Sequence, residues 1–485
     1  MFGAPITLLL HIIVVIIFSF RVISRRLAVH TTLAWLMVIA ALPVIGLLIY
    51  FLFGDHRLGR KRLKLGPKIR RHFQDAYEID EAETIRKELE VSDYFRHMSK
   101  VITKETGFNP SIGNKIKLYS DAHALFDVLI KDIDDAKEHL FLEFYIIDPQ
   151  GRVNEVLEAI IRAAKRGVDC RVLADDFGSK TFLKSHWPRS MMQVGVRVEA
   201  SLSVGILKSV SKRTDLRNHR KIIVIDQSIG YTGSLNLADP DYFKRDANVG
   251  AWVDIMIRLE GHIVSSLAVV FNTDFIFDHV GTDFDKSDIM KLPQHTRNEN
   301  FARDAVLQLI PSGPESYSSL IYEVIVSAIF GAQKKITITT PYFVPDEAIV
   351  LALCNAAKRG LEVRVILPHK VDSLMARFAG QAVFSEMLRA GVQIYRYQGG
   401  MLHTKSILID DDICFVGTVN VDMRSFYLNL EITMAVYDRF FHKALSRVVE
   451  DYIENSHLIE RELWKKRSFS IRWKENLLRL AGPLL

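Results

Sequence analysis

Two stretches of the chain carry the same polar and small residues at the same spacing, and these residue types suit chemistry on a phosphate. The first stretch is NHRKIIVIDQSIGYTGSLN and the second is LHTKSILIDDDICFVGTVN. Each has histidine, lysine two positions later, then aspartate, a glycine followed by a hydroxyl residue, and asparagine. The two sets are His219, Lys221, Asp226, Gly233, Ser234 and Asn236, and His403, Lys405, Asp410, Gly417, Thr418 and Asn420.

These residue types predict transfer of a phosphoryl group through a covalent intermediate. Two ammonium groups and two amides would hold and neutralise a phosphodiester. One imidazole could attack phosphorus and become a phosphohistidine, while the other protonates the leaving alkoxide and then deprotonates the incoming alcohol. Each imidazole needs a group that orients its other ring nitrogen. Candidate acids downstream of the two motifs are Asp254 and Glu431.

The sequence suggests neither a metal nor another cofactor for this chemistry. The three cysteines are Cys170, Cys354 and Cys414, and each sits in an apolar stretch far from the others. There is no C-x-x-C pair and no Cys/His cluster with metal spacing. We therefore expect three reduced core thiols.

Each motif is expected on a β-strand that positions it. Histidine and lysine two residues apart point to the same face of a strand. The residues after each lysine, Ile222 to Ile225 and Ser406 to Ile409, are mostly apolar and predict the buried body of a central strand. The aspartate would then end the strand at a turn. The next strand leads to Gly233 or Gly417, where a small residue would let backbone and substrate approach closely.

The strands belong to a segment that occurs twice in the chain. AKEHLFLEFYIIDPQGRVNEVLEAIIRAAKRGVDCRVLADD begins near Ala136, and AQKKITITTPYFVPDEAIVLALCNAAKRGLEVRVILPHK begins near Ala332. Each predicts a strand, a loop, an amphipathic helix ending in AAKRG and a second strand, which is a βαβ unit with parallel strands. Gly167 and Gly360 fit the position just past a helix. A chain of 485 residues with two such units predicts two similar α/β domains, at 111–295 and 296–485.

The first sixty residues predict a membrane anchor. Apolar runs cover about Ile6 to Phe20 and Thr31 to Phe53, and about 20 residues suffice to cross a bilayer. A cleavable signal peptide is disfavoured because no positive residue precedes the first run and Arg21 follows it directly. We expect a two-helix transmembrane hairpin in 1–56, then a basic linker and helix in 57–110. The basic cluster from Arg57 onward favours the cytoplasmic side for the rest of the chain.

Two further basic segments are ambiguous. The segment before the first motif, SLSVGILKSVSKRTDLRNHR, could steer anionic headgroups toward the site or be an ordinary solvated loop. The C-terminal segment, LWKKRSFSIRWKENLLRLAGPLL, is expected to pack an apolar helical stripe on the second domain. A helix lying in the membrane interface is the alternative.

The paired motifs resemble the HKD signature of the phospholipase D superfamily, from about Lys115 to Tyr452. The stretch RNHRKIIVIDQSIGYTGSLNLADPDYF and the ending LAGPLL are similar to the bacterial cardiolipin synthases of that superfamily. The resemblance implies two α/β domains sharing one active site, with His219 as nucleophile and His403 as acid and base. It also implies that Asp254 and Glu431 orient the imidazoles, and that Asp226 and Asp410 support the site through salt bridges.

The resemblance further implies that two phosphatidylglycerol molecules react reversibly to give cardiolipin and glycerol. The expected partners are phosphatidylglycerol and anionic membrane lipids of the bacterial inner membrane, without nucleic acid, and a homo-oligomer stays open. A phospholipase D or a phosphatidylserine synthase would keep the fold and change the acceptor. A nuclease of the same superfamily would fit the net charge of +6, but such nucleases usually lack membrane spans.

Overall fold

The computed structural model describes residues 3–25, 29–53, 92–203, 215–279, 305–314 and 319–480. The described elements fall into two compact units. The first unit holds the three N-terminal helices, and the second holds the elements from α6 (Asp93–Thr106) onward.

The N-terminal unit contains α1 (Gly3–Ser24), α2 (Val29–Ala41) and α3 (Pro43–Phe53). The second apolar run is therefore two helices rather than one, because a proline has no amide proton for the preceding turn and starts a new helix well. No helix in the described segments combines the length with the apolar character needed to cross a bilayer. The transmembrane hairpin stays a prediction, and the linker predicted before α6 lies largely outside the described residues.

The second unit is built on one sheet of 15 strands. The strands of its first half are β1 (Ser111–Tyr119), β2 (His139–Phe144), β3 (Asp169–Asp175), β4 (Arg197–Ser201), β5 (Lys221–Ile225), β6 (Ile229–Gly233) and β8 (Met256–Gly261). Those of its second half are β9 (Ala305–Ser312), β10 (Lys335–Thr339), β12 (Glu362–Pro368), β13 (Gln393–Tyr397), β15 (Ser406–Ile409), β16 (Ile413–Gly417) and β18 (Glu431–Val436), with β19 (Ser456–Leu458) at the edge.

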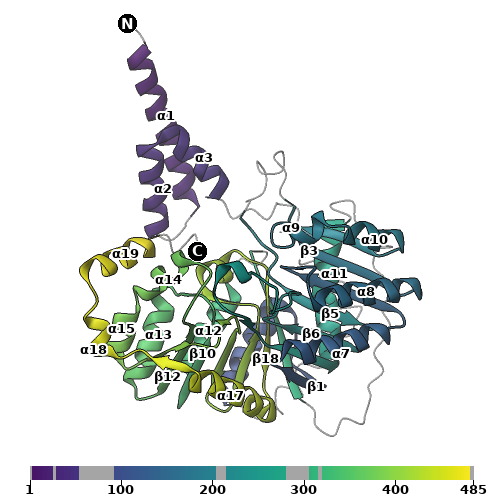
Figure 1. Cartoon of the computed structure of the whole chain (residues 1–485). Helices are drawn as coiled ribbons and strands as arrows, with labels where there is room; N and C mark the ends of the chain where they lie inside the picture. The colour runs from purple at the N-terminus through teal and green to yellow at the C-terminus, as the bar shows by residue number, and fades with distance from the viewer. Residues whose placement is uncertain are drawn as a thin grey trace. The chain divides into compact units, whose positions relative to one another are not determined.

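The two halves of the sheet have the same strand order and meet at an antiparallel pair, β1 with β9. From that pair outward the first half runs β1-β8-β6-β5-β2-β3-β4, and the second runs β9-β18-β16-β15-β10-β12-β13. Strands β2 and β3 pair in parallel, as do β10 and β12. The predicted βαβ units and the duplicated α/β fold are therefore confirmed, with both repeats joined in one continuous sheet (Figure 1).

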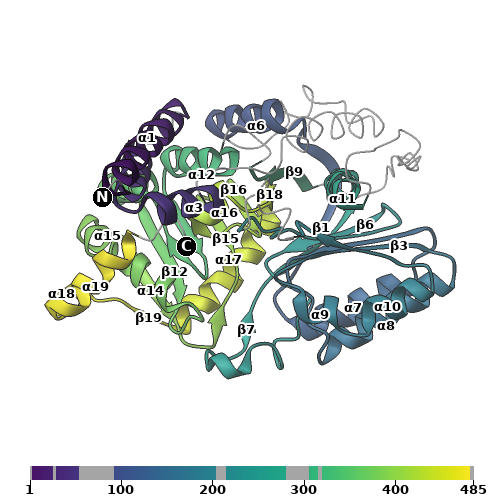
Figure 2. The same cartoon turned by 90° about the horizontal axis from the view of Figure 1, so that it is seen from above.

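Helices cover both faces of the sheet and bury its strands. In the first half, α7 (Ala122–Asp134) and α8 (Arg152–Lys165) lie on one face and α11 (Ile263–His279) on the other (Figure 2). The remaining helices of the unit are α9 (Lys180–Lys184), α10 (Trp187–Gln193), α12 (Leu320–Gly331), α13 (Glu347–Lys358), α14 (Leu374–Gln381), α15 (Phe384–Ala390), α16 (Met423–Tyr427), α17 (Arg439–Glu454), α18 (Arg461–Lys465) and α19 (Phe469–Arg479). Strands covered on both sides are apolar throughout, which explains the continuous apolar runs after each lysine.

Several local predictions are confirmed. The helices α8 and α13 each end one residue before a capping arginine, and Gly167 and Gly360 follow with φ of 95° and 94°, the left-handed conformation expected just past a helix. The three cysteines are buried and free of disulfides.

The expectation for the C-terminal helix is wrong. The helix α19 turns Glu475 inward, where it is 2% exposed, and apolar side chains of the helix and of the residue that follows it are exposed: Phe469, Trp473 and Leu480 are 74%, 55% and 78% exposed. The carboxylate of Glu475 pairs with Arg467, which explains how a charged residue can be buried here. The middle of the basic segment before the first motif, residues 204–214, lies outside the described residues.

Candidate active site

Both motif histidines lie just before a central strand, where their backbones are held by a residue of the other repeat. His219 precedes β5 and donates its backbone N–H to the carbonyl of Leu430 at 2.9 Å. His403 precedes β15 and donates its backbone N–H to the carbonyl of Val253 at 2.8 Å. Each repeat therefore helps to fix the position of the other repeat's histidine.

The orienting acids are crossed between the halves in the same way. His219 Nδ1 lies 2.8 Å from Glu431 Oε2, and His403 Nδ1 lies 2.7 Å from Asp254 Oδ1. All four side chains are buried. An ionised carboxylate can only accept hydrogen bonds, so each Nδ1 carries the proton and each Nε2 keeps its lone pair. Both histidines are thus preset as the tautomer that a nucleophile or base requires.

Burial sets the protonation of the imidazoles and their acids. It lowers the pKa of His219 and of His403 to about 4, although the adjacent carboxylates favour the protonated rings. Burial alone would raise the pKa of Glu431 and Asp254, but their histidine partners and the nearby lysines hold it below the ordinary value. At neutral pH the site therefore contains two neutral imidazoles beside two carboxylates.

The two lysines are buried next to these groups and lose part of their basicity. Lys221 Nζ donates to the carbonyl of His219 at 2.9 Å, and Lys405 Nζ donates to that of His403 at 2.6 Å. Burial, partly offset by the two carboxylates, lowers the pKa of Lys221 to about 8. Burial, offset by Asp254, and repulsion from Lys221 lower that of Lys405 to about 7. The negative charge of a phosphate bound in the site would raise the pKa of both lysines and so favour their charged forms.

One cavity of about 280 Å³ joins the two motifs. His219, His403, Asn236 and Asn420 all line it. The Oδ1 atoms of both asparagines are buried and have no hydrogen-bond partner within the described part of the chain. The structure thus brings both imidazoles and both amides to one space large enough for a phosphodiester headgroup.

The cavity has further lining residues that the motifs do not include. The ring of Tyr145 lies 5.1 Å from that of His219, and the ring of Trp252 lies 4.6 Å from that of His403. Other lining residues are Tyr342, Arg217, Lys244 and Arg424. The repeat in the sequence could have indicated the two tyrosines as site residues, because Tyr145 and Tyr342 each follow the first strand of a repeat.

Asp226 and Asp410 are not brought to the cavity. Each lies past the far end of its strand from the histidine, with φ of 48° and 52°. Asp226 accepts hydrogen bonds from the backbone N–H groups of residues 137, 138 and 139 at 2.7 to 2.9 Å, and Asp410 accepts the equivalent three from residues 333, 334 and 335. The expected salt bridges are therefore replaced by bonds to backbone, which tie the turn after each motif strand to the start of the neighbouring strand.

The small residues of the motif also serve packing instead of substrate approach. A Cβ on Gly233 would lie 2.5 Å from the carbonyl oxygen of Ile255, and one on Gly417 would lie 2.2 Å from that of Ile432. The expectation that substrate needs this space is wrong, because the adjacent strand fills it. The next residue supports the acids, since the hydroxyl of Thr418 donates to Glu431.

The duplicated sheet and the shared two-histidine cavity define a phospholipase D-like protein. A family model described as cardiolipin synthase, PLD-like domain, matches residues 129–272 and 325–455, and one described as phospholipase D-nuclease N-terminal matches residues 12–54. The chain belongs to the cardiolipin synthase family.

Relatives over nearly the whole chain agree with this family. Cardiolipin synthase A of Yersinia pseudotuberculosis serotype O:3 is 37% identical over 474 residues, covering 96% of this chain and 95% of the relative. Cardiolipin synthase A of Erwinia tasmaniensis is 37% identical over 476 residues with the same coverage. Among solved structures, phosphatidylserine synthase of Haemophilus influenzae Rd KW20 has a TM-score of 0.57 at 15% identity, covering 80% of this chain and 100% of that one. That likeness concerns the fold.

Proposed function

We propose that the protein transfers the phosphatidyl group of one phosphatidylglycerol to a second, giving cardiolipin and glycerol. The observation that carries this proposal is the single cavity lined by both His219 and His403, each hydrogen-bonded to a buried carboxylate of the other repeat. Relatives named cardiolipin synthase A, which align over nearly the whole chain, support the lipid substrate and the acceptor.

In the first half-reaction His219 acts as nucleophile. Its Nε2 lone pair attacks phosphorus, the P–O bond to glycerol breaks, and a phosphatidyl-histidine forms. Glu431 stabilises the positive charge that develops on the imidazole. His403 enters this step protonated and gives its Nε2 proton to the departing glycerol oxygen. A bound phosphodiester favours that protonation, because its negative charge opposes the lowering of the pKa by burial.

In the second half-reaction the bonds change in reverse order. The terminal hydroxyl of another phosphatidylglycerol gives its proton to His403 Nε2, its oxygen attacks phosphorus, and the P–N bond breaks. Lys221, Lys405, Asn236 and Asn420 stabilise the charge on the phosphoryl oxygens throughout. One P–O bond replaces another, so the reaction is close to thermoneutral and reversible.

We also propose that the protein works at the bacterial inner membrane. The predicted hairpin in 1–56 would anchor it, and α1 presents large apolar side chains to its surroundings, such as Ile16, Ile17 and Phe20, at 57 to 76% exposure. The exposed apolar side chains of α19 lie among Arg472, Lys474 and other basic residues, which suits an anionic bilayer surface. The two repeats would occupy residues 111–295 and 296–485. Both would lie on the cytoplasmic side of the membrane.

Incubation of the purified full-length protein with phosphatidylglycerol vesicles, followed by lipid analysis, tests the activity. We expect cardiolipin and an equal amount of glycerol. Phosphatidic acid as the main product would instead identify a hydrolase, and product formation that requires serine would identify a phosphatidylserine synthase. Substitution of His219 or His403 by alanine should each abolish turnover, while Glu158→Gln, on the exposed face of α8, should leave it unchanged.

A further inference from the structure

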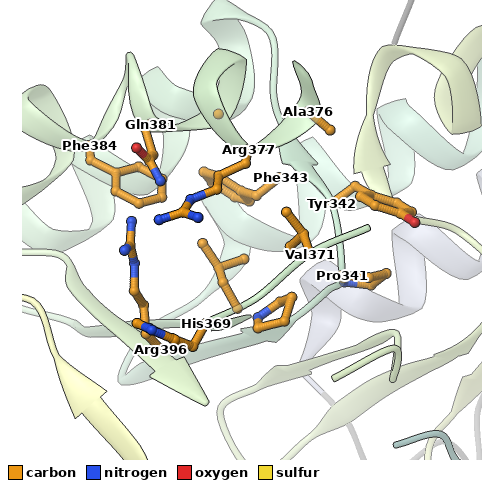
Figure 3. A pocket seen from close by; sticks show the side chains of 13 residues that line it. Pro341, Tyr342, Phe343, His369, Val371, Ala376, Arg377, Gln381, Phe384 and Arg396 are labelled. Carbon is orange, nitrogen blue, oxygen red and sulfur yellow. The ribbon is translucent and has the colours of Figure 1, made fainter. Parts of the chain in front are cut away.

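A second, smaller pocket adjoins the catalytic cavity. It has a volume of about 30 Å³ and shares Tyr342 and Ala376 with the cavity that holds the histidines. Arg377 on α14 and Arg396 on β13 bring their guanidinium groups together at one side of it, next to Gln381 (Figure 3). A polar group bound here would therefore lie beside the reacting phosphate without touching either histidine.

More guanidinium groups than carboxylates lie at this pocket. In the amide orientation that satisfies its neighbours, Gln381 accepts hydrogen bonds from Arg377 at 3.1 Å and Arg396 at 2.7 Å and donates to Glu475 at 3.2 Å. Glu475 already pairs with Arg467. Three guanidinium groups thus share one carboxylate. Burial, together with repulsion from Arg377 and Arg467, lowers the pKa of Arg396 to about 10.

Two cations that line the catalytic cavity have compensating partners. Lys244 donates to Asp372 at 2.9 Å. Arg217 stacks over Phe177 at 4.6 Å from the ring centre and lies near the carboxylate of Asp175. At the small pocket, Arg377 and Arg396 donate to the neutral amide of Gln381, and Arg396 also lies over the ring of Trp464 at 5.5 Å, so both can attract an additional anion. Paired guanidinium groups also match the geometry of a phosphate, because each can donate two parallel hydrogen bonds.

The reaction requires two phosphates to be held at once. Cardiolipin contains two phosphodiesters joined by one glycerol, so the acceptor's phosphate must lie one glycerol away from the phosphorus under attack. The catalytic cavity holds the transferred phosphate between the histidines. The adjoining pocket is the neighbouring place where a second phosphodiester would meet more guanidinium groups than carboxylates.

We propose that Arg377 and Arg396 bind the phosphodiester of the acceptor lipid and so select a phosphatidylglycerol over an alcohol without phosphate. This inference rests on the proposed function. Arg377 and Arg396 act by binding the acceptor and take no part in bond formation at phosphorus.

Two assays on the same full-length protein separate the acceptor site from the donor site. The first measures cardiolipin formed from phosphatidylglycerol. The second measures exchange of labelled glycerol into phosphatidylglycerol, which uses the same donor and the same histidines but an acceptor with no phosphate. We expect Arg377→Ala and Arg396→Ala to reduce cardiolipin formation by about 10- to 100-fold, the usual effect of losing a hydrogen bond to a charged group. Glycerol exchange should change by less than about twofold.

Three controls complete the experiment. Lysine at either position keeps the charge and should restore part of the cardiolipin synthesis, which excludes misfolding as the cause of the loss. Arg389→Ala removes an exposed arginine of α15 and should affect neither assay. Thermal unfolding with inorganic phosphate tests the pocket for free phosphate.

Each other outcome has a definite meaning. Equal losses in both assays, or no loss in either, would overturn the acceptor site. Stabilisation of the wild type by inorganic phosphate that is lost in Arg377→Ala, without a selective loss of cardiolipin synthesis, would make the pocket a free-phosphate site and overturn the assignment to acceptor lipid. A wild-type protein that exchanges glycerol but makes no cardiolipin would refute the proposed function itself, and the acceptor site with it.

Discussion

Each acid bonds the histidine of the other repeat, so substituting an acid should impair the step in which that histidine acts. The order of residues along the chain alone would assign each acid to the histidine of its own repeat. Glu431 belongs to the second repeat but bonds His219 of the first, and Asp254 belongs to the first but bonds His403 of the second. If His219 is the nucleophile and His403 the general acid, Glu431→Gln should impair attack on phosphorus. Asp254→Asn should impair protonation of the leaving group.

The size of each effect follows from burial of the pairs. The side chains of His219 and Glu431 are 9% and 0% exposed, and those of His403 and Asp254 are 5% and 4% exposed, so solvent screens neither pair. Removing one member of a buried ion pair costs about 3–5 kcal/mol. The imidazole becomes cationic during the reaction, so a comparable part of this cost falls on the transition state. At about 1.4 kcal/mol per factor of ten, each variant should lose about 10²- to 10⁴-fold in rate with phosphatidylglycerol as donor.

A donor with a better leaving group distinguishes the two roles. The p-nitrophenyl ester of phosphatidic acid releases p-nitrophenolate, which needs no proton from the enzyme. The initial burst of p-nitrophenol therefore reports nucleophilic attack alone. We expect Asp254→Asn to recover nearly the wild-type burst rate with this donor, while Glu431→Gln stays slow.

The reverse pattern would refute this reasoning. If Glu431→Gln recovers and Asp254→Asn does not, the nucleophile is His403. If both variants are slow with both donors, the acids hold the structure of the site and do not serve separate histidines. Glu158→Gln, with its exposed carboxylate, provides the matched control and should behave as wild type with either donor.

Three further predictions follow from the described contacts. The kcat/KM of the free enzyme should be greatest near pH 4: below it the nucleophile His219 takes up a proton, and above it His403 is less and less often in the protonated form that the leaving group needs. It should fall more steeply above about pH 7 to 8, where Lys405 and Lys221 lose their charge; a rate that stays flat toward pH ~10, the ordinary lysine range, would contradict this prediction. Asp226→Asn should lower the free energy of unfolding by about 1–3 kcal/mol, because three backbone N–H groups lose a charged acceptor, while the activity per folded molecule persists. Denaturant titration and active-site-normalised rates check this, and a large loss of specific activity would argue against a purely structural aspartate. Trp473→Glu on α19 should weaken binding to anionic vesicles in a flotation assay, and unchanged binding would show that this face does not meet the membrane.

The repeats, their strands and the identity of the motif residues could be predicted from the sequence because they depend on local patterns. Each of these patterns spans no more than a few tens of residues. They are the period of apolar residues, the glycine that ends each AAKRG segment and the spacing within each motif. The type of chemistry follows equally from the residue types, since two imidazoles and two ammonium groups suit a phosphodiester regardless of how they are brought together.

The tertiary structure decided which groups meet. Asp254 and His403 are 149 residues apart in the chain, and Glu431 and His219 are 212 apart, so their crossed hydrogen bonds depend on how the two halves of the sheet join. The same holds for Asp226, whose partners lie at the start of a neighbouring strand and just before it, and for α19, whose inward face carries a buried ion pair. Sequence periodicity describes which side of an element is apolar, but the surrounding elements determine whether that side is covered.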